Sequence, residues 1–433
     1  MKGMLMGRLC LQNKLVITGG FIAIIVIGCS KKNTVSTPPP NSGTDTGANG
    51  NPSLSHGYFA DSNFKPTGTF ITLAAVQKDG KIIIANPSGI GRINKDGSKD
   101  NSFTVASCDG GEIHSLALQD NGKILIGGSF LLVNGTATNY LARLNADGSQ
   151  DMSMNGNSIY DDALIQEDIK TLAVQKDGKI IVGGSFAWKT GPQVQGVTPH
   201  QANLIRLNAD GTFDPSLKPY TANYGEYTSN VTNVKILDNG QLMVCGSGFS
   251  AVDANGKSYP NIARLNSDAS VDTNFRWGGS SLTLSYSGTP IPGYGQIIAI
   301  QNDGKVLMGG KFNRIGNTSY NGLVRLGNTG ILDQAFTIYG YQVVTAICPF
   351  SDSVTFIGDM QDANINTANA GVTVLKADGI IDASFTLKFP RYGDIYNIIK
   401  ETDSTILLTG HIQTGNSQGN NLIYSGIGRI VKR

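Results

Sequence analysis

The chain has 433 residues, of which 40% are hydrophobic and 55 are glycine, and its formal net charge is +2. A charge so close to zero excludes the basic surface expected of a nucleic-acid-binding protein. The glycine content is well above the usual share of about 7%, which is typical of a protein with many tight turns.

Residues 1–28 have the features of a bacterial lipoprotein signal peptide. Three basic residues precede the apolar stretch Leu15 to Ile27, which is too short for a convincing membrane span. The sequence Val26-Ile27-Gly28-Cys29 resembles the lipobox, which implies cleavage before Cys29 and its lipidation, palmitate included. Several acyl chains, at about 0.8 kcal/mol per buried methylene, would anchor the protein firmly. We expect attachment to the bacterial outer membrane, with the surface and the periplasmic side both left open.

Residues 29–56 are predicted to be a disordered tether. This segment is rich in proline, glycine, serine and threonine and has no apolar periodicity. Removal of the signal peptide takes away three basic and no acidic residues, so 31 lysines and arginines remain against 32 aspartates and glutamates.

Residues 57–433 contain seven copies of one repeat. Its clearest form runs from Ile169 to Leu217: an apolar run, Asp-Gly-Lys, a second apolar run ending in Gly-Gly, a variable gap, Arg-Leu-Asn-x-Asp-Gly, and Asp-x-Ser followed by an apolar residue. The arginine recurs in six copies and is replaced by Val374 in the sixth; the arginines are Arg92, Arg143, Arg206, Arg264, Arg325 and Arg429. Because a single active site needs one such residue, the recurrence indicates an architectural role, most simply pairing with an aspartate.

Each copy is expected to form four short antiparallel strands. The apolar runs are four to six residues long, rich in isoleucine, valine and leucine, and bounded by glycine, aspartate and asparagine. Pairs such as Asp79-Gly80 and Asp96-Gly97 predict two-residue type I′ hairpin turns. The first and second turns of a copy then lie on one face of the fold, and the longer connections lie on the opposite face.

Seven such units predict an all-β fold, a seven-bladed β-propeller of four-stranded antiparallel blades. The last copy lacks its Asp-x-Ser-Phe run, whereas a spare one, Asp61 to Phe64, precedes the first copy. We therefore expect the N-terminal strand to complete the last blade, which removes an exposed edge. The repeat resembles the delta-60 repeat β-propellers, a resemblance that covers Gly57 to Arg433 and implies the fold but no established activity.

Few residues are available for catalysis or metal binding. The four histidines are not spaced as metal ligands, and only four glutamates occur. We therefore expect no metal and no cofactor. The least repeat-like candidates for a catalytic carboxylate are Asp161, Asp162 and Asp168. Cys108, Cys245 and Cys348 give no disulfide framework and are interpreted as buried thiols.

Binding residues are predicted on the long connections, which include 187–203, 218–230, 250–260 and 276–296. Variable loops on one side of a rigid scaffold are where binding residues concentrate. These segments carry aromatic side chains suited to stacking on sugars or anchoring a protein. The alternative is that they pack the loops onto the scaffold. The candidates are Trp188, Tyr224, Tyr227, Trp277, Tyr286 and Tyr294.

The sequence thus favours a noncatalytic scaffold or binding lipoprotein of the cell envelope, whose partners are membrane lipid through Cys29 and a glycan or an envelope protein. The alternative is a propeller polysaccharide hydrolase or lyase, which would need two carboxylates about 5 to 10 Å apart in the central channel.

Overall fold

The computed structural model describes residues 58–61, 63–66, 70–138, 140–154, 159–160, 167–189, 200–217, 230–277, 282–284, 291–320, 322–336, 343–351, 354–360, 371–388, 395–415 and 422–432. All of them belong to the larger of two compact units, Asn49–Arg433. The predicted signal peptide and tether, with Cys29, lie outside the described residues.

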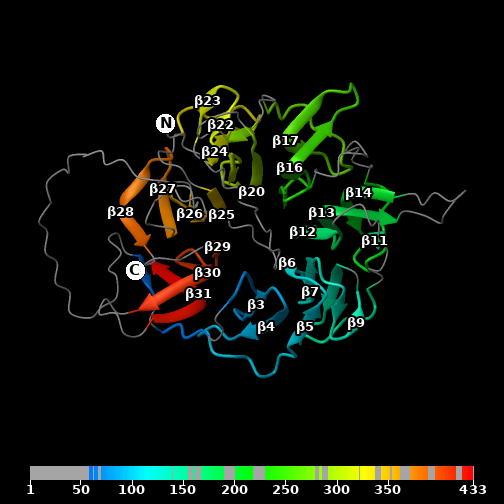
Figure 1. Ribbon diagram of the computed structural model, residues 1–433, viewed down its shortest axis with the longest axis vertical. Coiled ribbons are helices and arrows are strands. Elements are labelled where there is room, and N and C mark those ends of the chain that lie inside the picture. The colour runs from blue at the N-terminus through cyan, green and yellow to red at the C-terminus, as the bar shows by residue number, and fades with distance from the viewer. Residues whose placement is uncertain are drawn as a thin grey trace, which may run out of the picture. The chain divides into compact units, whose positions relative to one another are not determined.

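Antiparallel strands account for the regular structure of this part of the chain (Figure 1). Every copy begins with an inner strand, and these are β2 (Leu73–Val76), β6 (Ile113–Leu118), β12 (Asp168–Val174), β15 (Asn233–Ile236), β20 (Tyr294–Ile300), β25 (Val343–Ser351) and β29 (Ile395–Lys400). Each inner strand contacts the inner strand of the next copy, and β29 contacts β2.

Two further strands follow each inner strand: the second strand pairs with the inner strand and the third pairs with the second, in sequence order as predicted. The second strands are β3 (Ile82–Asn86), β7 (Ile124–Gly128), β13 (Ile180–Lys189), β16 (Leu242–Val252), β21 (Val306–Lys311), β26 (Val354–Met360) and β30 (Thr405–Gly415). The third strands are β4 (Gly89–Ile93), β10 (Leu141–Leu144), β14 (His200–Leu207), β17 (Ser258–Leu265), β24 (Leu323–Leu326), β27 (Gly371–Lys376) and β31 (Leu422–Lys432).

The expected fourth strand differs from the prediction in most copies. In copies one to five the predicted run itself forms only an isolated bridge, such as Leu144 with Gln150. The cause is local: the Asp-x-Ser run forms a turn in which Asp151 Oδ1 accepts a hydrogen bond from the backbone N–H of Ser153. Fourth strands are present elsewhere as β5 (Ala106–Asp109), β28 (Ile381–Lys388) and, paired with β31, β1 (Tyr58–Ala60).

The tight turns are also not of the predicted type. Gln77 N–H donates to Lys81 C=O, and Gly80 N–H donates to Gln77 C=O. Gly80 has a φ of 83°, while Asp79 is not among the residues with positive φ. The turn is therefore a three-residue loop, a type I turn closed by a glycine in the left-handed region, and not a type I′ turn.

Several long connections form additional hairpins. The segment 250–260, predicted as a loop, continues β16 and β17, which pair from Ser250 with Pro260 to Val252 with Ser258. Other short strands lie beyond the second strands or between copies: β8 (Leu132–Val133), β9 (Thr136–Ala137), β11 (Ile159–Tyr160), β18 (Leu282–Leu284), β19 (Ile291–Pro292), β22 (Arg314–Ile315) and β23 (Thr318–Ser319).

The hydrophobic core lies between the sheets of neighbouring copies. Phe130, at the end of the second strand of copy two, is fully buried against Ile83 and Ile90 of copy one. Phe186, Phe249 and Phe312 pack in the same way between later copies. The three described cysteines are free and buried, as predicted.

Candidate functional site

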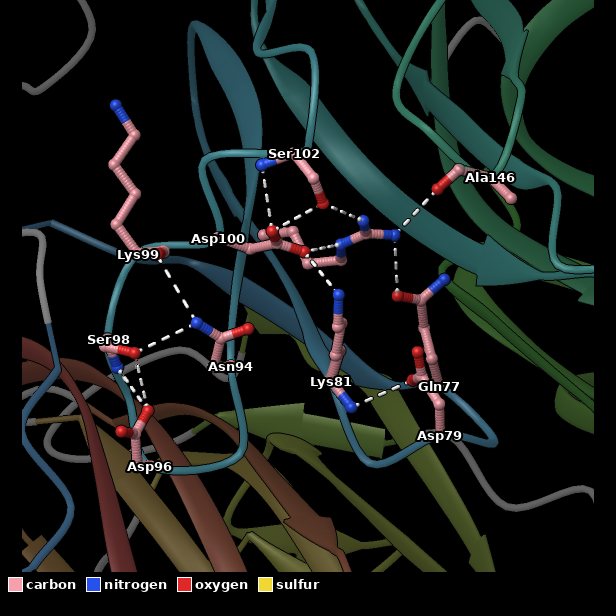
Figure 2. Close-up of polar contacts among 11 residues, drawn as sticks. Gln77, Asp79, Lys81, Asn94, Asp96, Ser98, Lys99, Asp100, Ser102 and Ala146 are labelled. Carbon is pink, nitrogen blue, oxygen red and sulfur yellow. Dashed lines mark hydrogen bonds and ion pairs between the residues drawn. The ribbon is translucent and has the colours of Figure 1, made fainter.

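The recurring arginine belongs to a network of ion pairs in its own copy. Arg92 Nε donates to Asp100 Oδ2 at 2.7 Å, and Lys81 Nζ donates to the same oxygen at 2.9 Å. Figure 2 shows Lys81 and Ser102 directed at the Asp100 carboxylate. Copies two and three repeat this arrangement, so the predicted pairing of the arginine with an aspartate is confirmed there.

The same arginine also reaches the next copy. Arg92 Nη1 donates to the carbonyl oxygen of Ala146, in the second tight turn of copy two, at 2.7 Å (Figure 2). The corresponding acceptors of Arg143, Arg206, Arg264 and Arg325 are the carbonyls of Ala209, Ser267, Asn328 and Ala377. Arg429, near the C-terminus, donates to Lys95 C=O of copy one at 2.6 Å.

The exception in copy six fits this pattern. Copy six has Val374 in place of the arginine, and Val374 is buried in an apolar cluster. The residue of copy seven that is equivalent to the acceptors, Lys432, lies in strand β31 beside β1 and not in a tight turn. The arginine is thus absent where the next copy offers no tight turn as acceptor, which agrees with a role in the contact between copies.

A polar cluster that the repeat does not explain lies at the start of two inner strands. His114 Nδ1 is 2.6 Å from Asp168 Oδ1, and His114 Nε2 is 3.4 Å from Glu112 Oε2. Lys170 forms an ion pair with the other Asp168 oxygen. We call Glu112, His114, Asp168 and Lys170 the His114 cluster. Because inner strands begin on the face opposite the tight turns, the cluster lies on the long-connection face.

Burial divides the cluster into a supporting and an accessible part. The Asp168 side chain is 7% exposed, whereas that of Glu112 is 63% exposed. Burial raises the pKa of Asp168. The hydrogen bond and charge of His114 and the charge of Lys170 outweigh this effect, so the pKa of the carboxyl lies below its ordinary value. Asp168 thus orients the imidazole. His114, Glu112 and Lys170 are the more exposed members of the cluster.

Lys235, on the inner strand of copy four, has a lowered pKa. Solvent reaches the Lys235 side chain on β15, but protein atoms surround it closely enough that desolvation lowers the pKa of its ammonium group. Burial raises the pKa of Cys348 to about 11.

Of the predicted aromatic binding residues, three lie where the structure describes at least their backbone. Trp188 is in β13, where it pairs with Gln201 on one side and Ile159 on the other. Trp277 is only 4% exposed and packs in the core with Met243 and Phe275, which matches the alternative of a loop packed onto the scaffold. Tyr294 is half-buried at the start of β20. Tyr224, Tyr227 and Tyr286 lie outside the described residues.

The predicted carboxylate Asp168 belongs to the cluster, whereas Asp161 and Asp162 lie outside the described residues. Sequence reasoning missed His114 and Glu112, although one signal was available. His114 occupies the position that holds Thr72, Thr232 and Thr345 in other copies, so it departs from the repeat. Among the described residues, no group of three histidine, cysteine, aspartate or glutamate side chains is arranged to hold a metal ion.

Comparison with known families gives one match. Four segments, 119–153, 175–217, 237–275 and 301–336, match the model of a domain of unknown function (DUF5122) described as a β-propeller. These segments carry the same repeat pattern as the remaining copies, so the fold is that of a β-propeller. The curated proteins contain no match to the chain. Within the part of the chain that the structure describes, no helix is long and apolar enough to span a membrane.

Solved structures resemble the chain at low identity. One is the extracellular domain of a protein described as a one-component system from B. thetaiotaomicron, with 15% identity and a TM-score of 0.45, covering 83% of this chain but only 38% of that one. Virginiamycin B lyase from Staphylococcus aureus has 13% identity and a TM-score of 0.43, covering 86% and 99%. PorZ, a surface component of the type-IX secretion system of Porphyromonas gingivalis, has 11% and 0.41, covering 86% and 48%. Similarity at this level says nothing about the activity of this chain.

Proposed function

We propose that this chain is a lipid-anchored, seven-bladed β-propeller of the bacterial cell envelope that binds a glycan or protein partner through its long-connection face. The closed ring is supported by the contact of β29 with β2 and by the pairing of β1 with β31. It is also supported by the hydrogen bond from Arg429 to Lys95, which joins the last copy to the first.

The His114 cluster is the observation that carries the binding proposal. The tight-turn face is occupied by the arginine networks, whose charged groups are already paired within the fold. On the opposite face, the cluster contains the imidazole of His114 and the ammonium group of Lys170, both bound to the buried Asp168, and the exposed carboxylate of Glu112 beside the imidazole. A preorganised set of donors and acceptors suits the hydroxyl groups of a sugar or the polar groups of a peptide.

Lipid anchoring is proposed from the lipobox that ends at Cys29. The test is crosslinking and co-purification of the tagged chain from its native envelope, with the Cys29→Ala variant as the unanchored control. We expect the wild type in the membrane fraction with a stoichiometric partner, and the variant in the soluble fraction without it. A wild-type chain recovered from the soluble fraction would contradict the anchor.

Ligand binding at the His114 cluster is tested separately, on a panel of envelope glycans and on any partner recovered above. We expect His114→Ala and Glu112→Gln to weaken binding at least tenfold. Lys176→Ala is the matched control, because Lys176 is exposed on the opposite face. Equal binding by all three variants would remove the cluster from the binding site.

A second candidate function is hydrolysis or elimination on a polysaccharide. It is favoured by one observation: the carboxylates of Glu112 and Asp168 flank the same imidazole, with the buried Asp168 orienting it as in a general-base pair. Incubation with acidic and neutral polysaccharides, followed by assays for reducing ends and for unsaturated products, tests this. Activity that is lost in His114→Ala would replace the binding proposal by an enzymatic one.

A further inference from the structure

Lys235 occupies a position on its inner strand that is neutral in every other copy. In each copy, one inner-strand residue pairs with the second-strand residue that faces the recurring arginine, or Val374 in copy six. In copy four this residue is Lys235, which pairs with Met243. Lys235 is the one charged residue at this level of the seven inner strands, where the other copies have Ala75, Ala117, Ala173, Ala299, Cys348 and Ile399.

A contact with copy five identifies the face of β15 on which Lys235 lies. Asn233 Oδ1 accepts a hydrogen bond from Ile298 N–H of β20 at 3.3 Å. Lys235 follows Asn233 by two residues, so both lie on the same face of the strand. β15 is also the edge of its sheet, and it contacts the inner strands β12 and β20. Lys235 therefore starts at the inner edge of its sheet, on the side of copy five.

The charge of Lys235 acts beyond copy five. Burial raises the pKa of Cys348 to about 11, and the charges of Lys400 and Lys235 oppose this rise. Cys348 is on β25, the inner strand of copy six, although Lys235 belongs to copy four. Because the inner strands contact one another in a closed series, the space between these two residues lies along the axis of the ring. We call it the axial space; solvent reaches it, since Lys235 is exposed.

The ammonium group of Lys235 has no partner among the described residues. The recurring lysines differ, because Lys81, Lys123 and Lys179 each pair with a buried aspartate. Protein atoms crowd Lys235 and lower its pKa by desolvation. A desolvated ammonium group without a counter-charge destabilises the fold, and an anion bound beside it would relieve this effect.

We propose that Lys235 binds a small carboxylate ligand in the axial space. One ammonium group balances one negative charge, which favours a carboxylate over a sulfate or phosphate dianion. The alanines at the same level in four other copies take up little of the space beside it. This site is separate from the His114 cluster, and of the proposed function it rests on the closed ring alone.

The test measures the pKa of Lys235 by NMR titration of the full chain carrying Cys29→Ala, with isotope-labelled lysine. The signal that is absent from Lys235→Met identifies the residue. Acetate is the probe, and acetamide is its neutral counterpart. We expect acetate to raise the pKa saturably, because a bound carboxylate favours the ammonium form, and acetamide to leave it unchanged. Sulfate should raise it less than acetate does, and a larger rise with sulfate would overturn the assignment of a carboxylate.

Thermal melting provides a second measurement. Lys235→Met removes the unpaired charge at similar length, so it should melt a few degrees higher than the parent chain and gain no stability from acetate. Lys176→Met is the matched control, because Lys176 is exposed, and it should respond to acetate as the parent chain does. A lowered pKa of Lys235 that acetate does not raise overturns the site and leaves the closed ring standing. An ordinary pKa without a response to acetate contradicts the closed ring as well.

Discussion

Tight turns closed by a glycine recur along this chain, so glycines in different turns can be compared with one another. Gly148 and Gly240 both close a tight turn in the left-handed region, with φ of 88° and 83°. Their surroundings differ: a Cβ atom at Gly148 would lie 2.2 Å from Thr104 O, whereas at Gly240 nothing lies within 4 Å. The turn of copy two is pressed against the end of copy one.

Replacing these glycines with alanine separates backbone strain from steric contact. Gly240→Ala should cost about 1 kcal/mol in the free energy of unfolding, the usual penalty of a left-handed alanine. Gly148→Ala should cost clearly more, because the backbone of copy one must also move. Urea denaturation of both variants measures the difference, and equal losses would contradict the close contact between the copies.

The ionised aspartates predict how stability depends on pH. The hydrogen bond from Ser102, followed by that from Lys81, lowers the pKa of Asp100 well below its ordinary value of 3.8. In Asp151, burial raises the pKa, but hydrogen bonds from Lys123 and Ser153 outweigh it and leave the pKa below 3.8. A lowered pKa in the folded state stabilises the fold above the unfolded pKa, and this contribution is lost as pH falls through the folded pKa.

We therefore expect the free energy of unfolding to change little through these groups from pH 7 to 5, and to fall steeply below about pH 4. Urea denaturation between pH 3 and 7 measures this. An unchanged free energy of unfolding between pH 5 and 3 would show that the folded state does not lower the pKa values of Asp100 and Asp151.

At the scale of strands and turns, the recurring arginine joins neighbouring copies. Arg206 Nε pairs with Asp214 at 2.7 Å, and Arg206 Nη1 donates to Ser267 C=O of the next copy at 2.7 Å. In four copies the guanidinium also stacks on the phenylalanine of Asp-x-Ser-Phe or its equivalent, as Arg92 does on Phe103. The arginine thus contributes both to its own turn and to the next sheet.

Removing one of the recurring arginines should lower the free energy of unfolding, and introducing an arginine at Val374 in copy six should lower it too. Arg206→Gln leaves Asp214 with the Lys179 ion pair alone and removes the hydrogen bond to Ser267, and should lower the free energy of unfolding by about 2 kcal/mol. Val374→Arg restores the repeat pattern in copy six but should also destabilise, because it buries a charge among apolar side chains where copy seven offers no second turn. Chemical denaturation tests both, and a stabilised Val374→Arg variant would refute the assigned role.

At the scale of the whole molecule, residues 58–64 at the beginning of the described chain belong to the sheet of the last copy. Phe64 lies under the Arg429 guanidinium at 4.3 Å, and Asp61 N–H donates to Arg429 C=O. Arg429 also makes two hydrogen bonds to Glu401, at 2.6 and 2.7 Å. The strand nearest to the proposed lipid anchor is therefore part of the sheet that contains the C-terminus.

Truncation measures what this strand contributes. A chain starting at residue 57 should melt as the full chain does, because it retains β1 and Phe64. A chain starting at residue 65 should melt several degrees lower and aggregate more readily, since it exposes the edge of β31. Calorimetry and light scattering provide the measurements, and identical melting of the two truncated chains would show that β1 is dispensable.

The sequence by itself determined the order of the first three strands of a copy, the positions of the turns and the burial of the cysteines. These follow from local patterns, namely apolar alternation and Asp-Gly pairs, that act over a few residues. The strand expected over Asp-x-Ser-Phe was wrong in most copies, because the aspartate side chain closes a local turn, in which Ser153 N–H donates to Asp151 Oδ1, and apolar periodicity does not register such a turn.

Only the tertiary structure brought Glu112, His114, Asp168 and Lys170 together, since they start inner strands of two different copies. The strands and turns of a repeat protein can be predicted from its sequence because every copy has similar residues at the same strand and turn positions. A site that occurs once, such as the His114 cluster, depends on which copies pack next to each other, and only the tertiary structure decides this.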